Sequence, residues 1–347
     1  MAAASPGCSS PERTCSGNRR TAASSTPVAL RLVTDDAAPA VRRIGFLGPE
    51  GTFTEQALLG QPDLASQELV PMSTIAEVLA ATDSGEIDLG FVGIENSIEG
   101  TVNVTIDALA FEHDLLIQRE VELGIQLNLL APPGVGTADL TRVLTFPVAM
   151  GQCRAWVANH LPSVEVVAAN SNADAARLVA LEADGHTGAI APALAAKIYG
   201  LDVLVTNIED HPENTTRFVL VARDTVPPAT GHDKTTIVVL QRADRPGSLL
   251  AILQEFAARA INLVKLESRP TKKGLGHYCF IIDLEGHLSD ELVADCLRDV
   301  RSKVEDIKYL GSYPAAGEHG PAVRREAEEA WRTADDWIRD QRAKLTP

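Results

Sequence analysis

The sequence predicts an α/β protein of more than one domain, and two observations carry this prediction. From position 43 onward, short apolar runs alternate with helical segments in a βαβ rhythm, which is typical of a mostly parallel sheet. After a polar linker at 224–233 the order changes to βαββαβ, the ferredoxin-like arrangement of a smaller domain. With 347 residues, of which 45% are hydrophobic, the chain can bury more than one core.

The first βα series follows residues 1–41, which are rich in Ala, Ser, Pro and Thr and are expected to form a disordered lead. Thr52-x-x-Glu55 and Thr74-x-x-Glu77 match the capping box, in which a hydroxyl and a carboxylate satisfy free backbone donors at a helix start. The expected elements are strands at 44–47 and 87–94 and helices at 52–59 and 104–110.

A second βα series completes the first domain, which is expected to span 42–223. Its expected elements are strands at 143–145, 164–168 and 188–190, helices at 152–160 and 173–182, and two returning apolar runs at 201–207 and 216–222. The segment 115–130 and the returning runs would cross between two α/β lobes, which would leave a cleft between them. Ligands of such sheets bind at the carboxyl ends of strands, near helix N-termini.

The smaller domain is expected at 234–314, with strands at 235–240, 263–269, 276–284 and 307–313 and helices at 247–259 and 290–300. Residues 315–347 are charged and have helical propensity, with a partial apolar stripe accompanied by Trp331 and Trp337. We interpret this tail as a loosely attached helix, the alternative being a helix that packs on a partner subunit.

Composition excludes several classes of function. A net charge of −16 would repel nucleic acid and anionic membranes, so neither is an expected partner. No apolar run reaches the roughly 18–20 residues that span a bilayer, and no signal peptide is recognisable. Five scattered cysteines favour a reducing cytoplasm over a disulfide framework, and the sequence indicates neither a metal nor a cofactor.

Polar residues occur where strands of the expected cleft begin or end. Thr52 opens a helix after a Gly-containing turn, Ser171 precedes another helix, and Asn96 and Ser97 end a strand. Each corner offers hydroxyl or amide donors to an anion, and each also fits an ordinary turn or helix cap. In Asn214-Thr215-Thr216-Arg217-Phe218, a hydroxyl and a fixed cation are adjacent at a strand entrance. Because the chain is acidic overall, an anionic substrate needs such a local cation.

Four motifs carry a family resemblance. They are Gly48-Pro49-Glu50-Gly51-Thr52-Phe53-Thr54-Glu55, Gly93-Ile94-Glu95-Asn96-Ser97-Ile98-Glu99-Gly100, Asn214-Thr215-Thr216-Arg217-Phe218 and Glu267-Ser268-Arg269-Pro270. In this order and spacing, from about residue 42 to about residue 314, the chain resembles the prephenate dehydratases with their C-terminal ACT regulatory domain. The resemblance implies a two-lobed catalytic domain that is periplasmic-binding-protein type II-like. It also implies conversion of prephenate to phenylpyruvate, with loss of water and carbon dioxide, in L-phenylalanine biosynthesis.

The resemblance assigns roles to residues of the expected cleft. Thr216 would donate a hydrogen bond to the leaving hydroxyl, and Arg217 can hold the pyruvyl carboxylate through two parallel hydrogen bonds. Thr145 and Gln152 match family positions that donate to the substrate. The remaining expected substrate ligands are Thr52, Asn96, Ser97 and Ser171. The central expectation is that Thr216, Arg217 and Asn96 share one crevice.

Three positions depart from the family pattern, since Phe146 and Leu127 stand where a His is usual or frequent and Gly93 where a Pro is more frequent. These changes argue against a proton shuttle through histidine. Cys153 is interpreted as a small core residue rather than a nucleophile. The alternatives are an arogenate dehydratase, a prephenate decarboxylase that does not aromatise, and a catalytically silent amino-acid sensor; the retained Thr216 favours dehydration.

The ACT domain implies feedback regulation by L-phenylalanine. The expected effector residues are Pro246, Gly247, Ser248 and Leu249 in a loop and helix start, and Glu267, Ser268, Arg269 and Pro270 in the family's allosteric motif. Because such sites usually lie between paired ACT domains, a homodimer or a homotetramer is expected.

Overall fold

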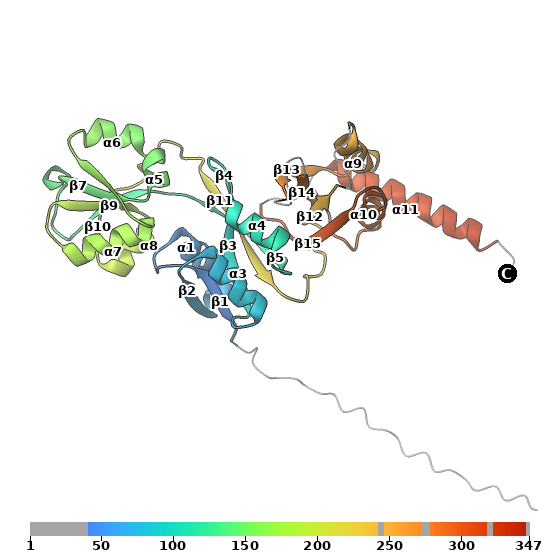
Figure 1. Cartoon of the computed structure of the whole chain (residues 1–347), viewed down its shortest axis with the longest axis horizontal. Helices are drawn as coiled ribbons and strands as arrows, with labels where there is room; N and C mark the ends of the chain where they lie inside the picture. The colour runs from blue at the N-terminus through green and yellow to red at the C-terminus, as the bar shows by residue number, and fades with distance from the viewer. Residues whose placement is uncertain (1–40, 242–245, 272–277, 318–321, 345–347) are drawn as a thin grey trace, which may run out of the picture. The chain divides into compact units, whose positions relative to one another are not determined.

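The computed structural model describes residues 41–241, 246–271, 278–317 and 322–344, with the side chains of 322–331 excepted (Figure 1). All but the last residue of the expected N-terminal lead therefore lies outside the described residues. The described residues form two α/β lobes followed by a four-stranded antiparallel domain and a C-terminal helix.

The first lobe is built on a mixed sheet with the strand order β2-β1-β3-β11-β5, to which β4 adds on β3. Its strands are β1 (Arg43–Leu47), β2 (Glu68–Met72), β3 (Leu89–Asn96), β4 (Gly100–Thr101), β5 (Leu116–Gly124) and β11 (Thr215–Ala222). Its helices are α1 (Phe53–Leu59), α2 (Pro62–Ala65), α3 (Ile75–Ser84) and α4 (Asn103–Phe111). Strands β1, β2 and β3 are parallel, whereas β11 runs antiparallel to both β3 and β5. The expected mostly parallel sheet is thus correct only for its first half, because β11 returns from the second lobe.

Strand β2 was not expected from the sequence, and Pro71 explains why. Proline is rare inside sheets because it lacks the N–H that a ladder requires. Here β2 is an edge strand that pairs with β1 alone, so one side of its backbone needs no partner strand.

The second lobe has the strand order β10-β6-β9-β7-β8, with helices on both faces of the sheet (Figure 1). Its strands are β6 (Asn128–Ala131), β7 (Arg142–Thr145), β8 (Glu165–Ala168), β9 (Thr187–Ala191) and β10 (Asp202–Val205). Its helices are α5 (Pro147–Gln152), α6 (Arg154–His160), α7 (Asn172–Glu182) and α8 (Ala193–Tyr199), with a 3₁₀ turn at Thr137–Asp139. The helix expected at 152–160 corresponds to α6, which begins two residues later. The preceding helix α5 was not expected, and it is separated from α6 by Cys153, where φ is −117° and ψ is 12°.

The third sheet confirms the expected βαββαβ order and has the strand order β13-β14-β12-β15, in which all neighbours are antiparallel. Its elements are β12 (Asp233–Leu240), α9 (Ser248–Ala258), β13 (Leu263–Pro270), β14 (Tyr278–Glu285), α10 (Glu291–Lys303) and β15 (Asp306–Pro314). Apolar residues of α9 and α10, such as Phe256 and Val293, pack on one face of this sheet against Ile237 and Ile282.

The other face of the third sheet packs on the first lobe. Val238, Ile281 and Leu310 share one buried core with Ile117 and Val219 of the first lobe. The two backbones approach closely at Gly311, whose φ is +128° and where an added Cβ would lie 2.6 Å from the carbonyl oxygen of Ile117. Only glycine fits such a contact in that conformation. The third sheet, which we call the regulatory sheet because it belongs to the expected ACT domain, therefore packs directly against the sheet that carries β11.

The C-terminal helix α11 (Ala322–Arg342) confirms the helical propensity of the tail. Trp337 and Ile338 are 61% and 39% exposed, so they contribute little to the core of this chain. The side chain of Trp331 and most of the predicted apolar stripe lie outside the described residues.

Candidate active site

The motifs around Asn96 and Thr216 meet on neighbouring strands. β3 and β11 are antiparallel, and their register pairs Asn96 with Thr216 and Glu95 with Arg217. The short strand β4 extends the same two rungs, because Gly100 pairs with Asn96 and Thr101 pairs with Glu95. Successive residues of a strand point to opposite faces of the sheet. The two rungs therefore present their side chains to two different environments.

The Asn96–Thr216 rung belongs to a chain of neutral side chains, which we call the amide chain and which consists of Gln152, Asn214, Asn96 and Thr216. Gln152 Oε1 accepts a hydrogen bond from Asn214 Nδ2 at 2.9 Å, and Asn214 Oδ1 accepts one from Asn96 Nδ2 at 2.8 Å. The same Asn96 Nδ2 donates to Thr216 Oγ1 at 2.9 Å. The amide chain thus ends on the hydroxyl that the sequence singled out.

The direction of these hydrogen bonds is set by the backbone. Asn96 Oδ1 accepts from the N–H groups of Ile98 and Glu99 at 2.9 and 3.0 Å, so the amide nitrogen must be the atom that faces Thr216. A hydroxyl that accepts from a donor can direct its own proton elsewhere, and hydrogen bonds in series polarise one another. Thr216 is partly exposed at this position. The Thr216 hydroxyl can therefore donate its proton in a hydrogen bond toward the exposed side.

Asn214 is a component of the site that was not among the predicted ligands. It is 1% exposed and links Gln152 of the second lobe to Asn96 of the first. The signal was present in the sequence, since Asn214 and Thr216 are two residues apart at a strand entrance and so face the same side. Asn214 connects the two lobes at the point where the chain returns between them.

Arg217 faces away from the amide chain, and the expectation that it shares a crevice with Thr216 is wrong. Its Nε donates to Glu120 Oε2 at 2.5 Å, its Nη1 to Asp283 Oδ2 at 2.6 Å and to Glu95 Oε2 at 3.2 Å, and its Nη2 to the hydroxyl of Tyr313 at 2.8 Å. The side chain is only 10% exposed. All three nitrogens are therefore committed to protein groups, which leaves no edge of the guanidinium for a substrate carboxylate.

Electrostatics keep this arginine charged in its buried position. Burial by itself lowers the pKa of the Arg217 guanidinium, but the carboxylates of Asp283 and Glu120 raise that pKa above its ordinary value. Burial raises the pKa of the Tyr313 hydroxyl, and Asp283 raises it further, so Tyr313 stays protonated. Arg217 and its partners thus form a buried ion cluster between β11, β5 and the regulatory sheet, in which the positive charge is balanced by carboxylates.

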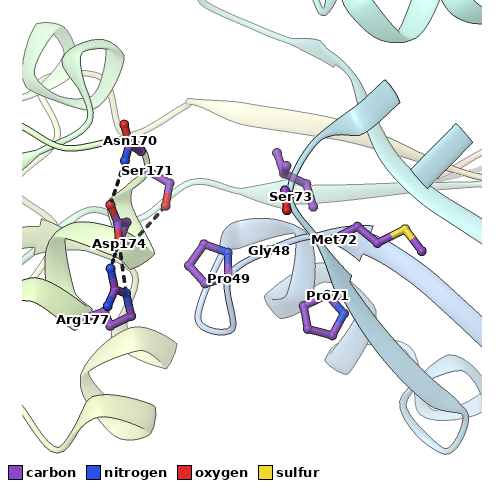
Figure 2. Close-up of a pocket in the computed structure, with 10 residues that line it drawn as sticks. Gly48, Pro49, Pro71, Met72, Ser73, Asn170, Ser171, Asp174 and Arg177 are labelled. Atoms are coloured by element: carbon purple, nitrogen blue, oxygen red, sulfur yellow. Dashed lines mark hydrogen bonds and ion pairs between the residues drawn. The ribbon is translucent and has the colours of Figure 1, made fainter. Parts of the chain in front are cut away.

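A pocket of about 460 Å³ lies between the two lobes, at the carboxyl ends of strands as the fold predicts (Figure 2). Its walls are formed by Leu47, Gly48, Pro49, Pro71, Met72, Ser73, Asn170, Ser171, Asp174 and Arg177. This volume is within the range of small-molecule sites. Arg177 is the arginine of this wall, and Asp174 Oδ1 accepts from its Nε at 3.1 Å and its Nη2 at 2.6 Å.

Four of the predicted ligands have defined local roles. Thr52 Oγ1 donates to the Leu47 carbonyl at 3.0 Å and accepts from Glu55 N at 3.3 Å, so its hydroxyl caps α1 and has no proton left for a ligand. Ser171 lines the pocket and caps α7, accepting from Asp174 N at 3.0 Å, which leaves its own proton to donate.

Ser97 and Thr145 lie at the ends of their strands. Ser97 Oγ accepts from Thr215 N at 3.0 Å, which closes the end of the β3–β11 ladder. Thr145 is 1% exposed, and its hydroxyl lies 3.4 Å from the carbonyl oxygen of Phe146. The structure therefore joins Asn96 to Thr216 directly and to Gln152 through Asn214, and it places Ser171 in the pocket wall. The Thr145 hydroxyl instead faces the backbone of its own strand end.

The residues at the unusual positions are not part of a proton relay. Phe146 is 38% exposed at the start of α5, and Leu127 is fully buried in the second lobe. Cys153 is also fully buried, and burial, with Asp210 and Glu209 nearby, raises the pKa of its thiol to about 12. A thiol with that pKa is not a nucleophile at neutral pH, in agreement with the interpretation of Cys153 as a core residue.

The expected allosteric motif has two faces. Glu267 and Arg269 on β13 point toward the first lobe, where Glu267 Oε2 accepts from Thr101 Oγ1 at 2.5 Å and Arg269 Nη2 donates to Asp107 Oδ1 at 2.5 Å. Ser268 and Pro270 alternate with them and are exposed. At the other expected effector segment, Gly247 has φ of +86° and Ser248 begins α9. Residues 242–245, which precede it, lie outside the described residues.

Neither a metal centre nor a membrane span is found in the part of the chain that the structure describes. Within it, His, Cys, Asp and Glu side chains form no group of three or more that could ligate a metal ion. No described helix combines the length and apolar character needed to cross a bilayer.

Fold and site together define a class of protein, a two-lobed α/β enzyme with a cleft between its lobes and a ferredoxin-like regulatory domain behind one of them. Family models narrow this class, since the model for prephenate dehydratase matches residues 44–226 and the ACT domain model matches residues 235–302. A prephenate dehydratase from Mycolicibacterium vanbaalenii is 43% identical over 293 residues, which cover 80% of this chain and 93% of the relative. The chain belongs to the prephenate dehydratase family.

Solved structures agree with this assignment. The structure of a prephenate dehydratase from Arthrobacter aurescens in complex with L-Phe is 41% identical, with a TM-score of 0.80, and covers 87% of this chain and 100% of that one. A second structure, described as a novel type of quorum-quenching acylase, is 32% identical with a TM-score of 0.72 and covers 79% of this chain and 98% of that one. Because one fold can host different activities, the chemistry has to be argued from the site.

Proposed function

We propose that this protein converts prephenate to phenylpyruvate and that the Thr216 hydroxyl, held by the amide chain, assists departure of the substrate hydroxyl. In this reaction the ring carboxylate leaves as carbon dioxide, and its bonding electrons enter the ring as the ring hydroxyl departs. The departing oxygen takes up a proton and leaves as water. The observation that carries the proposal is that Asn96 donates to Thr216, which frees the Thr216 proton for the substrate.

The role of Thr216 is that of a positioned hydrogen-bond donor. A donor aimed at developing negative charge, in a site held by fixed hydrogen bonds, stabilises the transition state without further reorganisation. A threonine hydroxyl is a weak acid, so the proton that completes water formation can come through Thr216 from solvent rather than from threonine alone. The neutral amide chain fits this role because it adds no negative charge next to a dicarboxylate substrate.

Arg177 replaces Arg217 as the cation that holds a substrate carboxylate. It lines the interlobe pocket, and the two hydrogen bonds to Asp174 fix the orientation of its guanidinium. The hydroxyl of Ser171 lies in the same wall. If this assignment is correct, Arg177→Gln raises KM for prephenate more than it lowers kcat, because a clamp on a non-reacting group contributes mainly uniform binding.

Regulation by L-phenylalanine is part of the proposal. It is supported by the match to the ACT domain and by the family relative whose structure contains L-Phe. The effector binds at 246–249 and beside the exposed side of β13, at Ser268 and Pro270. The protein acts in the cytoplasm as a homodimer or homotetramer in which ACT domains pair, which size-exclusion chromatography with light scattering would measure.

The test of the proposed function is an absorbance assay for phenylpyruvate with the purified full-length chain. Prephenate is expected to give product, and added L-phenylalanine is expected to reduce the rate. Parallel reactions with arogenate separate an arogenate dehydratase from a prephenate dehydratase by which substrate has the higher kcat/KM. Absence of product from both substrates, together with phenylalanine binding in calorimetry, would instead identify an amino-acid sensor.

A further inference from the structure

The ion cluster around Arg217 joins the catalytic strands to the regulatory sheet. Asp283 on β14 and Tyr313 on β15 contact Arg217 from the regulatory side, while Glu120 on β5 contacts it from the first lobe. Thr236 on β12 holds both regulatory groups, since its hydroxyl lies 2.7 Å from Asp283 Oδ1 and 2.7 Å from the Tyr313 hydroxyl. The two strands that flank β12, namely β14 and β15, therefore both contact Arg217, the residue that follows Thr216.

A second connection reaches the same arginine from β13. Glu95 uses one carboxylate oxygen for each side: Oε2 lies 3.2 Å from Arg217 Nη1, and Oε1 lies 3.3 Å from Lys265 Nζ. Lys265 is 9% exposed, and its Nζ also donates to Thr101 Oγ1 at 2.8 Å. Thr101 in turn donates to Glu267. We call Glu267, Thr101, Lys265, Glu95 and Arg217 the coupling chain.

The coupling chain runs along one rung of the sheet, directly beside the rung that holds Thr216. Thr101, Glu95 and Arg217 are partners across β4, β3 and β11, and the next rung consists of Gly100, Asn96 and Thr216. A shift of the backbone at Glu95 or Arg217 moves the backbone of Asn96 or Thr216 as well, because each pair is joined by one peptide unit. The hydrogen bond from Asn96 to Thr216 is the contact that such a shift would lengthen.

We propose that Glu95 and Arg217 are positioning residues that set the Asn96–Thr216 hydrogen bond, and that Lys265 transmits the state of the regulatory domain to them. This inference rests on the proposed function, because it uses the same Thr216 and the same effector. Binding of an amino acid beside β13 alters the position of Lys265 relative to Glu95, and the coupling chain converts that change into misalignment of Thr216.

The experiment compares Lys265→Met with Lys308→Met in the full-length chain. Both lysines extend from the regulatory sheet to the first lobe, but Lys308 Nζ donates to the His113 carbonyl at 2.7 Å and lies 3.1 Å from Asp114, outside the coupling chain. Methionine keeps the aliphatic length of either side chain. For each variant, prephenate kinetics are measured with and without saturating L-phenylalanine, phenylalanine affinity is measured by calorimetry, and stability is measured by urea unfolding.

In Lys265→Met, the phenylalanine-induced change in kcat/KM is expected to shrink by about 2- to 30-fold, with phenylalanine affinity in the range of the wild type and normal kcat without effector. Lys308→Met is expected to keep the full inhibition. Glu95→Gln should reduce the inhibition in the same way, and the double variant Glu95→Gln with Lys265→Met should lose no more than the single variants, because both break one link.

Equal inhibition in Lys265→Met and wild type would overturn the coupling chain, and so would an equal loss of inhibition in both lysine variants. Wild-type protein that turns over prephenate but ignores phenylalanine would also overturn it, while leaving the proposed activity intact. Wild-type protein without any turnover would overturn the proposed function and with it this inference. A change confined to the urea midpoint of Lys265→Met would show a purely structural role and contradict the proposal.

Discussion

Two adjacent rungs of one β-ladder differ in almost every physical respect. The rung of Asn96 and Thr216 faces a chain of neutral amides, while the rung of Glu95 and Arg217 faces a buried cluster of charges from the regulatory sheet. Neutral groups suit the first rung, since the substrate is itself a dianion that a carboxylate would repel. Charged groups suit the second rung, because separating the members of a buried ion cluster costs much free energy. A displacement of one member is therefore passed on to the others.

Two residues that are adjacent in the sequence can therefore belong to two different functional regions. Thr216 and Arg217 are consecutive, so an extended backbone must send them to opposite faces. One face provides the proposed chemistry and the other provides the connection to the regulatory domain. Single substitutions can therefore break one rung at a time.

The largest effect is expected for Thr216→Ala. Loss of one hydrogen-bond donor to developing charge typically costs about 2.7–4 kcal/mol, so kcat for prephenate should fall by about two to three orders of magnitude. Thr216→Ser keeps the hydroxyl and serves as the control, with kcat close to that of the wild type. Steady-state assays measure kcat of both variants. A decrease in kcat smaller than tenfold in Thr216→Ala would contradict a role of this hydroxyl in the reaction.

The next largest effect concerns stability and belongs to the charged rung. Arg217→Gln leaves Asp283 buried without its cation and leaves Glu120 with Lys234 as its remaining cation. Removing one member of a buried ion pair typically costs about 3–5 kcal/mol in the free energy of unfolding. Arg119→Gln is a matched control, because Arg119 forms a two-point ion pair with Asp63 at the surface, where such pairs contribute about 0–1 kcal/mol. Urea unfolding of both variants gives the comparison. A stable Arg217→Gln protein with a raised KM would return Arg217 to the role of substrate ligand.

A smaller effect is expected from Glu55 at the start of α1. Burial raises the pKa of the Glu55 carboxyl, a backbone hydrogen bond from Gly51 opposes that rise, and Glu50 adds to it. A carboxyl whose pKa is higher in the folded than in the unfolded state stabilises the fold below its unfolded pKa and loses this contribution as the pH rises. Glu55→Gln should therefore raise Tm at pH 7, and the gain should diminish toward pH 4. A gain that grows on acidification would contradict the sign of the shift.

Much of the fold was predictable from the sequence, because apolar periods and capping boxes are local signals. The helix starts at Thr52 and Thr74 are capped by their hydroxyls as the pattern indicates. Less predictable were the antiparallel return of β11 and the edge strand that contains Pro71, since both depend on pairing between distant segments. Local pattern identifies an element more reliably than it identifies its neighbours.

The site was predictable in composition but not in orientation. The motif around Thr216 identified the correct strand. Because side chains alternate along a strand, the sequence already indicated that Thr216 and Arg217 face opposite sides and that Asn214 faces the same side as Thr216. The partners of Arg217, such as Asp283 and Tyr313, are 66 and 96 residues away in sequence, so no local pattern could reveal the ion cluster.

We propose that Asn96 acts through Thr216, and a double-mutant cycle on kcat is the sharpest test of this claim. Asn96→Ser removes the nitrogen that donates to Thr216 and to Asn214 without adding a negative charge beside the dianionic substrate, and a serine hydroxyl can still accept from the backbone N–H groups that follow it. Asn96→Ser is expected to lower kcat in the wild-type background and to have little further effect when Thr216 is already Ala. Fully additive losses in the double variant would show that the two side chains act independently and would contradict the claim.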